Sequence, residues 1–95
     1  MPSCFKKTAH VVEREIRGEH ILVPIMRNME TLDSIYTLNE TAGCIWRNAV
    51  SGMTEDRIAT LLAEEFDVDP ATAQADTRRI LNDLIEIKAL QPVTD

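Results

Sequence analysis

The two cysteines and two histidines are the first residues to test for chemistry, because thiolates and imidazoles serve as nucleophiles, bases and metal ligands. Cys4 and Cys44 stand outside any Cys-x-x-Cys spacing, and two cysteines are too few for a disulfide framework. His10 and His20 fall in segments that we expect to be strands, with no Cys, Asp or Glu at a recognisable ligand spacing. The chain also lacks a Gly-x-x-x-x-Gly-Lys-Ser/Thr phosphate loop and a Gly-x-Ser-x-Gly nucleophile motif. We therefore expect no metal, no cofactor and no enzymatic activity.

The size and charge of the chain narrow its partners. Its 95 residues, 44% of them hydrophobic, are enough for one domain with a small core, which we place at residues 1–95 with the core at about 9–91. Ten basic and 16 acidic residues give a net charge of −6, whereas phosphate-binding domains carry a basic patch, so we expect no nucleic acid. No apolar run approaches the roughly 20 residues of a membrane span, and the start lacks a signal-peptide pattern. We expect a cytoplasmic protein with no membrane partner.

Extended segments occupy the first third of the chain. Mixed charged and apolar residues predict strands at 11–16, 20–26 and 34–38. Pro24 lies inside the second strand and cannot donate a ladder hydrogen bond, so we expect an edge or a bulge there. Cys4, ahead of all three, is expected on a mobile terminus.

Three helices follow, and each begins at a residue that suits a helix start. Asn39, Thr54 and Asp69 can accept hydrogen bonds from the free N–H groups of a first helical turn, and Pro70 suits the first helical position. Apolar residues at helical spacing extend the helices over residues 39–50, 55–66 and 70–88. Three strands followed by three helices predict an α+β fold, with Trp46 of the first helix buried in its core.

The third predicted helix has more apolar surface than one core contact needs. One stripe contains Ala73, Thr77, Ile80, Leu84 and Ile87, and a second contains Leu81 and Ile85. The helix is either packed on two sides by its own domain, or the second stripe faces a groove for a partner. In the second case the strand at 34–38 would form the opposite wall, because its free edge could pair with an extended peptide.

A DNA-binding regulator of the winged-helix type is the alternative. The third helix offers Arg78, Arg79 and Asn82 for contacts with bases and phosphates, but it also carries Asp76, Asp83 and Glu86. The acidic residues and the overall charge disfavour this alternative.

An ordered set of short motifs resembles the PqqD-like family. Its most specific part is Leu38-Asn39-Glu40-Thr41-Ala42 followed by Ile45-Trp46, and the Gly52-x-Thr54 step agrees in order and spacing. This resemblance implies a three-stranded antiparallel sheet joined to a winged helix-turn-helix unit. It also implies a noncatalytic peptide chaperone, a RiPP recognition element. Such a protein holds the leader of a ribosomally made precursor peptide and presents it to a radical SAM enzyme.

The family resemblance suggests where a leader peptide would bind. It implies that the peptide adds as a strand beside the third strand and lies against the third helix. Arg78 could then meet an acidic leader residue, while two apolar side chains of the same helix supply selectivity. The sequence leaves open whether the pathway makes pyrroloquinoline quinone and whether the protein is a monomer or a homodimer. The expected peptide-binding residues are Ser34, Ile35, Tyr36, Thr37, Arg78, Leu81 and Ile85.

Overall fold

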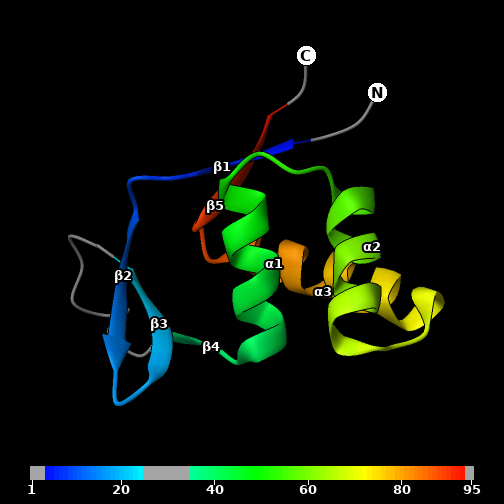
Figure 1. Cartoon of the computed structure of the whole chain (residues 1–95). Coiled ribbons are helices and arrows are strands. Elements are labelled where there is room, and N and C mark those ends of the chain that lie inside the picture. The colour runs from blue at the N-terminus through cyan, green and yellow to red at the C-terminus, as the bar shows by residue number, and fades with distance from the viewer. Residues whose placement is uncertain (1–3, 25–34, 94–95) are drawn as a thin grey trace.

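The computed structural model describes residues 4–24 and 35–93. Its three helices and two antiparallel sheets confirm the α+β prediction, including the three-stranded sheet and the three helices. In Figure 1 the helix α1 lies between the three-stranded sheet and the other two helices. The elements are β1 (Cys4–Lys7), β2 (Val11–Ile16), β3 (Glu19–Pro24), β4 (Tyr36–Leu38), α1 (Glu40–Val50), α2 (Glu55–Phe66), α3 (Pro70–Glu86) and β5 (Leu90–Val93).

The three-stranded sheet has the order β2-β3-β4, with β3 in the centre. β2 and β3 form a hairpin whose two loop residues, Arg17 and Gly18, have φ angles of 53° and 81°. Positive φ at both positions is the conformation of a type I′ turn, whose twist matches that of paired strands. Pro24 is the last residue of β3, so the expected continuation to residue 26 lies outside the described residues.

A second sheet, which the sequence analysis did not predict, joins the two ends of the chain. β1 and β5 pair antiparallel, with Cys4 opposite Val93 and Lys7 opposite Leu90. The expectation that Cys4 lies on a mobile terminus is therefore wrong. Just after β1, the backbone N–H of Thr8 donates to the carbonyl of Ala89 at 3.0 Å, which extends the pairing to the residue just before β5.

The predicted helix starts are confirmed. Asn39 accepts a hydrogen bond from the Ala42 N–H at 2.8 Å, Thr54 accepts one from Arg57, and Asp69 accepts bonds from the first turn of α3. Each bond satisfies a backbone donor that the helix itself leaves without a partner.

The end of α3 differs from the prediction. The helix ends at Glu86, two residues before the expected Lys88. Lys88 adopts φ of 67°, and the N–H of Ala89 donates to the carbonyl of Leu84 at 2.9 Å. This left-handed helix end satisfies the last carbonyls and turns the chain into β5.

The core forms where α1 meets the inner face of the sheet and the other helices. Trp46 is 1% exposed, which confirms its predicted burial. No helix among the described residues has the length and apolar composition needed to cross a membrane. The largest fully buried side chains are Trp46, Leu22, Ile45, Ile58, Leu62, Leu81, Leu84 and Leu90.

Replacing Trp46 with alanine should destabilise the domain by about 3–5 kcal/mol, because it removes a large buried side chain and leaves a cavity. Val50→Ala is a matched control on the same helix, because Val50 is 37% exposed. Thermal unfolding followed by circular dichroism measures both variants. Equal melting temperatures for the two would contradict the central role of Trp46.

Candidate functional site

The strand β4 is an open edge of the three-stranded sheet. Leu22 and Ile21 of β3 pair with Tyr36 and Thr37 on one side, and no described strand pairs with β4 on the other. Thr37 is exposed, and the preceding Ile35 is 52% exposed. An edge strand presents main-chain donors and acceptors that a further strand can use.

Tyr36 connects this edge to the helix α3. Its side chain is half-buried and packs against the core. Burial raises the pKa of Tyr36, and the negative charge of Asp83 and a hydrogen bond to its carboxylate raise this pKa further, while Arg79 acts in the opposite direction. Asp83 and Arg79 both belong to α3, so β4 and this side of α3 lie next to each other.

α3 has three sides with different surroundings. Its core side is formed by Ala73, Thr77, Ile80, Leu81 and Leu84. A second side faces α2, where the Gln74 amide donates to Asp56 at 3.2 Å and the Arg78 guanidinium donates to Glu55 at 3.0 Å. The third side carries Arg79 and Asp83 and faces Tyr36.

The expectation that Leu81 belongs to an outward-facing stripe is wrong. Leu81 is 1% exposed and is part of the same core as Leu84. Helical spacing places residues 81 and 84 on adjoining parts of one face, and a helix packed by α1, α2 and β5 buries both. The two apolar stripes are thus one broad face, as in the alternative of a helix packed by its own domain.

The remaining predicted residues lie in three different places. Tyr36 and Thr37 lie on β4, with Ile35 directly before it, whereas Ser34 is outside the described residues. Arg78 faces α2 through its ion pair with Glu55. Ile85 is half-buried and borders an open hollow of about 250 Å³ beside the β1–β5 ribbon. Peptide binding by the strand residues stays a prediction.

Sequence reasoning missed Arg79 and Asp83 as residues beside β4. Their contact with Tyr36 joins positions more than forty residues apart, and periodicity shows only that they share a side of the helix. The sequence signal that could have pointed to them is that Arg79 and Asp83 lie on a polar side of the helix, beside its apolar stripes.

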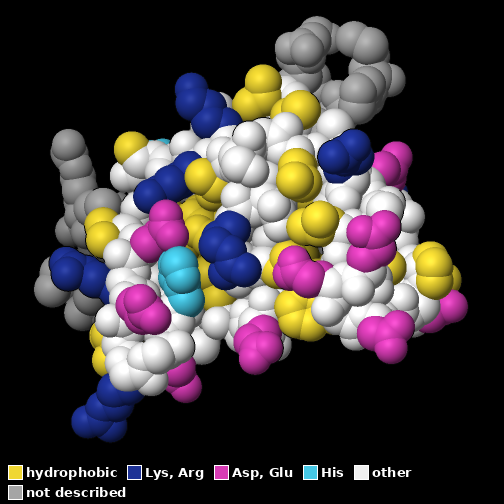
Figure 2. Space-filling view, viewed as in Figure 1, with side chains coloured by type: hydrophobic (Ala, Val, Ile, Leu, Met, Phe, Trp, Pro, Cys, Tyr) yellow, Lys and Arg dark blue, Asp and Glu magenta, His cyan; other side chains and the backbone are white. Residues whose placement is uncertain are grey.

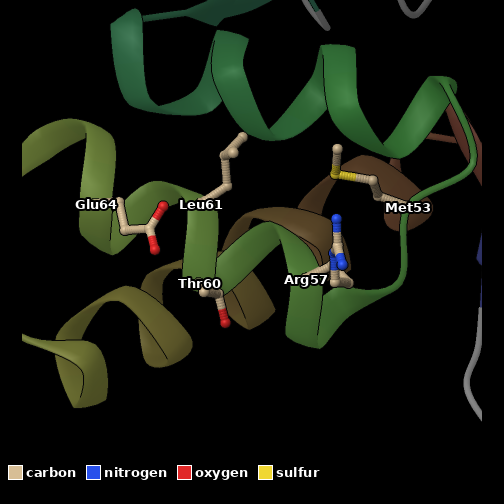
Figure 3. Close-up of a pocket in the computed structure, with 5 residues that line it drawn as sticks. All are labelled: Met53, Arg57, Thr60, Leu61 and Glu64. Atoms are coloured by element: carbon tan, nitrogen blue, oxygen red, sulfur yellow. The ribbon is translucent and has the colours of Figure 1, made fainter.

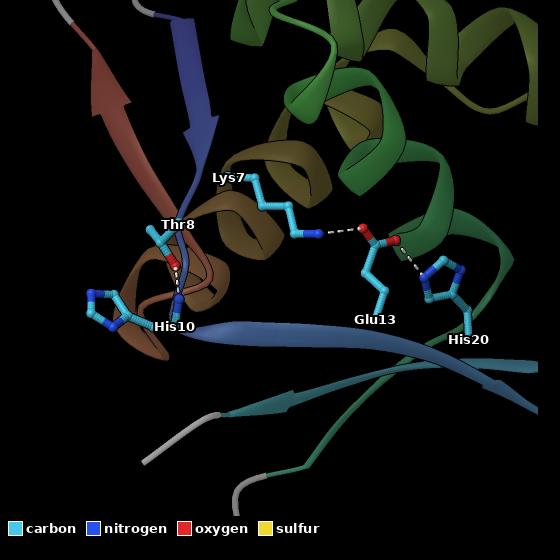
Figure 4. Close-up of polar contacts among 5 residues, drawn as sticks. All are labelled: Lys7, Thr8, His10, Glu13 and His20. Atoms are coloured by element: carbon cyan, nitrogen blue, oxygen red, sulfur yellow. Dashed lines mark hydrogen bonds and ion pairs between the residues drawn. The ribbon is translucent and has the colours of Figure 1, made fainter. Parts of the chain in front are cut away.

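A polar network on the helix-facing side of the sheet links β1, β2 and β3 (Figure 4). The Lys7 ammonium donates to Glu13 Oε2 at 3.0 Å, and His20 Nε2 lies 2.9 Å from Glu13 Oε1. Burial on its own would raise the pKa of Glu13, but hydrogen bonds from Trp46, Lys7 and His20 outweigh it and hold this pKa below its usual value. The network joins β1, β2, β3 and α1, which fits a structural role.

Cys44 is a poor candidate for a nucleophile. Burial is the main cause that raises the pKa of the Cys44 thiol, which disfavours a reactive thiolate. An open hollow of about 250 Å³ is lined by Met53, Arg57, Thr60, Leu61 and Glu64 (Figure 3). The Thr60 hydroxyl there donates to the backbone carbonyl of Asp56 at 3.0 Å. In the described part of the chain, no group of three or more His, Cys, Asp or Glu side chains could hold a metal ion.

Comparisons with known proteins assign the family. The family described as coenzyme PQQ synthesis protein D (PqqD) matches residues 19–90. The chain belongs to the PqqD family. The matched segment runs from β3 through β4 and the three helices to the start of β5. A search of curated proteins found no match.

Three solved structures share the fold. TbiB1 in complex with the TbiA(beta) leader peptide is 24% identical, with a TM-score of 0.74 over 95% of this chain and 99% of that one. A lasso peptide synthetase B1 complexed with the leader peptide is 20% identical, with a TM-score of 0.74 over 95% and 98% of the two chains. The PqqD truncation of Methylobacterium extorquens PqqCD, a stand-alone RiPP recognition element, is 24% identical, with a TM-score of 0.67 over 92% and 87%. All three support the same α+β fold for this PqqD-family chain.

Replacing Leu81 with alanine should cost about 2–5 kcal/mol of stability, because the residue fills the core. Asn82→Ala, at the exposed neighbouring position, should stay close to the parent. Urea unfolding measures both. An unchanged urea midpoint for Leu81→Ala would contradict the assignment of Leu81 to the core.

Glu13→Gln should destabilise the protein at neutral pH, because it removes the charge that Lys7 and the indole of Trp46 stabilise. The pKa of Glu13 is lower in the folded chain than its usual 4.5, so its contribution is present above pH 4.5 and is lost as the pH falls through the folded value. The difference in free energy of unfolding between variant and parent should therefore narrow in acid. Glu15→Gln, at an exposed position on the same strand, is the control. A difference that stays constant with pH would contradict this role of Glu13.

Proposed function

We propose that this PqqD-family chain is a noncatalytic RiPP recognition element that binds the leader segment of a ribosomally made precursor peptide. The observation that carries the proposal is the open edge of β4 beside the charged side of α3, linked through Tyr36. A peptide that adds as a strand gains affinity from main-chain hydrogen bonds, while its alternate side chains meet the neighbouring helix. Two structural neighbours were solved in complex with leader peptides, which supports this function.

β4 is a better site for strand addition than the other edge strand, β2. Glu13, Arg14 and Glu15 place consecutive charges along β2, a pattern that protects edges from pairing. Glu13 is also held inward by Lys7 and His20. β4 carries Tyr36 and Thr37 instead and has α3 beside it, so a peptide there gains contacts with both strand and helix.

The family also supports a place for the protein in peptide modification. We propose that the chain presents its bound leader to a radical SAM enzyme, in a pathway that makes pyrroloquinoline quinone or a related peptide-derived product. It would act in the cytoplasm as a monomer or a homodimer. Its helices would form a winged helix-turn-helix unit that binds peptide and not DNA. A second copy could pair through the same β4 edge, in which case leader peptide should dissociate the dimer.

Several charges disfavour the DNA-binding alternative. Arg78 forms an ion pair with Glu55, and Nη2 of Arg79 lies 3.8 Å from Oδ1 of Asp76 on the same helix. On the face shown in Figure 2, Lys and Arg side chains are scattered among acidic and apolar ones and form no continuous basic stripe. Duplex DNA binding normally relies on such a stripe.

A leader peptide with N-methyl groups tests strand addition directly. The leader of a precursor encoded beside the gene for this chain is methylated at alternate residues, in two sets that differ by one position. Only the set that points its N–H groups at β4 should lose binding, by about tenfold or more, because each lost main-chain hydrogen bond costs about 0.5–1.5 kcal/mol.

Chemical-shift mapping with the unmodified leader gives the location. Perturbations should centre on Ile35, β4 and the Arg79–Asp83 side of α3. Equal loss of affinity with both methylated sets, or perturbations confined to α2, would contradict the proposed site.

A further inference from the structure

The side of α3 that faces β4 is mainly acidic. Asp76, Arg79, Asp83 and Glu86 follow one another at spacings of three or four residues, so they share one side of the helix. Three carboxylates and one guanidinium give this strip a formal charge of −2, and the whole chain has the same sign with −6. We call these four residues the acidic strip.

Some charges of the acidic strip have an oppositely charged neighbour within the domain, and others do not. Arg79 lies 3.8 Å from Asp76, so these two charges offset each other locally. Asp83 is half-buried beside Tyr36, whereas Glu86 is exposed one turn further along. Among the described residues, neither Asp83 nor Glu86 has a Lys, Arg or His partner within ion-pair distance.

We infer that the acidic strip selects leader peptides with a Lys or Arg at the position that faces Asp83 and Glu86. This inference rests on the proposed function, because it needs a strand on β4. In such a strand every second side chain points to the same face, so a fixed position meets α3. A basic side chain there pairs with Asp83 and Glu86, whereas an acidic one is repelled and slowed in its approach by the net charge of the chain.

The same geometry separates the strip from Arg78, which the sequence made the candidate partner for an acidic leader residue. Arg78 is turned to α2 and paired with Glu55 at 3.0 Å. The only guanidinium on the strip, Arg79, already has a carboxylate neighbour. Among the described residues, the net charge left for a peptide beside Tyr36 is negative.

A random peptide library displayed on phage tests this preference. The full chain is used as bait, alongside a double variant with Asp83→Asn and Glu86→Gln. Asparagine keeps an acceptor for the Tyr36 hydroxyl, so the variant removes charge at little cost in shape. The matched control is Glu64→Gln with Glu65→Gln, which removes two charges from exposed positions of α2.

The parent and the α2 control should enrich peptides with Lys or Arg at one fixed position within a β-forming stretch. The strip variant should lose this enrichment. It should bind the selected peptides about three- to tenfold more weakly at low salt, a difference that shrinks as salt screens the charges.

The outcomes separate the two proposals. Peptides that map to β4 and α3 without a basic preference, or with equal affinity for parent and strip variant, overturn the inference and leave the proposed function in place. If no selected peptide maps to β4, the proposed function fails and the inference fails with it.

Discussion

The contact between Trp46 and Glu13 is the interaction on which the rest of the arrangement depends. The indole ring fills the core from α1 and lies close enough to Glu13, on the inner face of the sheet, to help lower the pKa of that carboxylate. A partly buried carboxylate needs polar partners, and Glu13 has them in Lys7 at 3.0 Å and His20 at 2.9 Å. Because α1 follows β4 directly, holding α1 against the sheet also sets the position of the open β4 edge.

The second constraint is the deep burial of α3. Its core side extends across Leu81 as well as Leu84, and its α2 side is occupied through Gln74 and Arg78. The side left for β4 is polar. A domain of this size uses most of its apolar side chains to form a core. At the proposed peptide site, this leaves charge and Tyr36 as the source of selectivity.

Local signals in the sequence predicted the helices and most strands well. The features that the sequence analysis missed depend on contacts between residues far apart in the chain. Asn39, Thr54 and Asp69 each bind backbone groups within three residues, so their chemistry is readable without a structure. The β1–β5 pairing joins Cys4 to Val93 across nearly the whole chain, and no short motif encodes it. The strand residues of the candidate site were predicted from their place just before the first helix. The residues of α3 were not, because periodicity shows which residues share a side of a helix and does not show which side lies next to β4.

The short length of β4 limits unwanted pairing at this sheet edge. The strand has three residues, and short edge strands offer few hydrogen bonds to an arbitrary chain. Under the proposed function, strand addition alone would therefore give weak binding, and a leader peptide would also have to satisfy the side of α3 that faces Tyr36. The edge can remain open without promoting indiscriminate pairing. Under the same proposal, an extended peptide with suitable side chains would gain from strand and helix together, so the short strand would favour specificity.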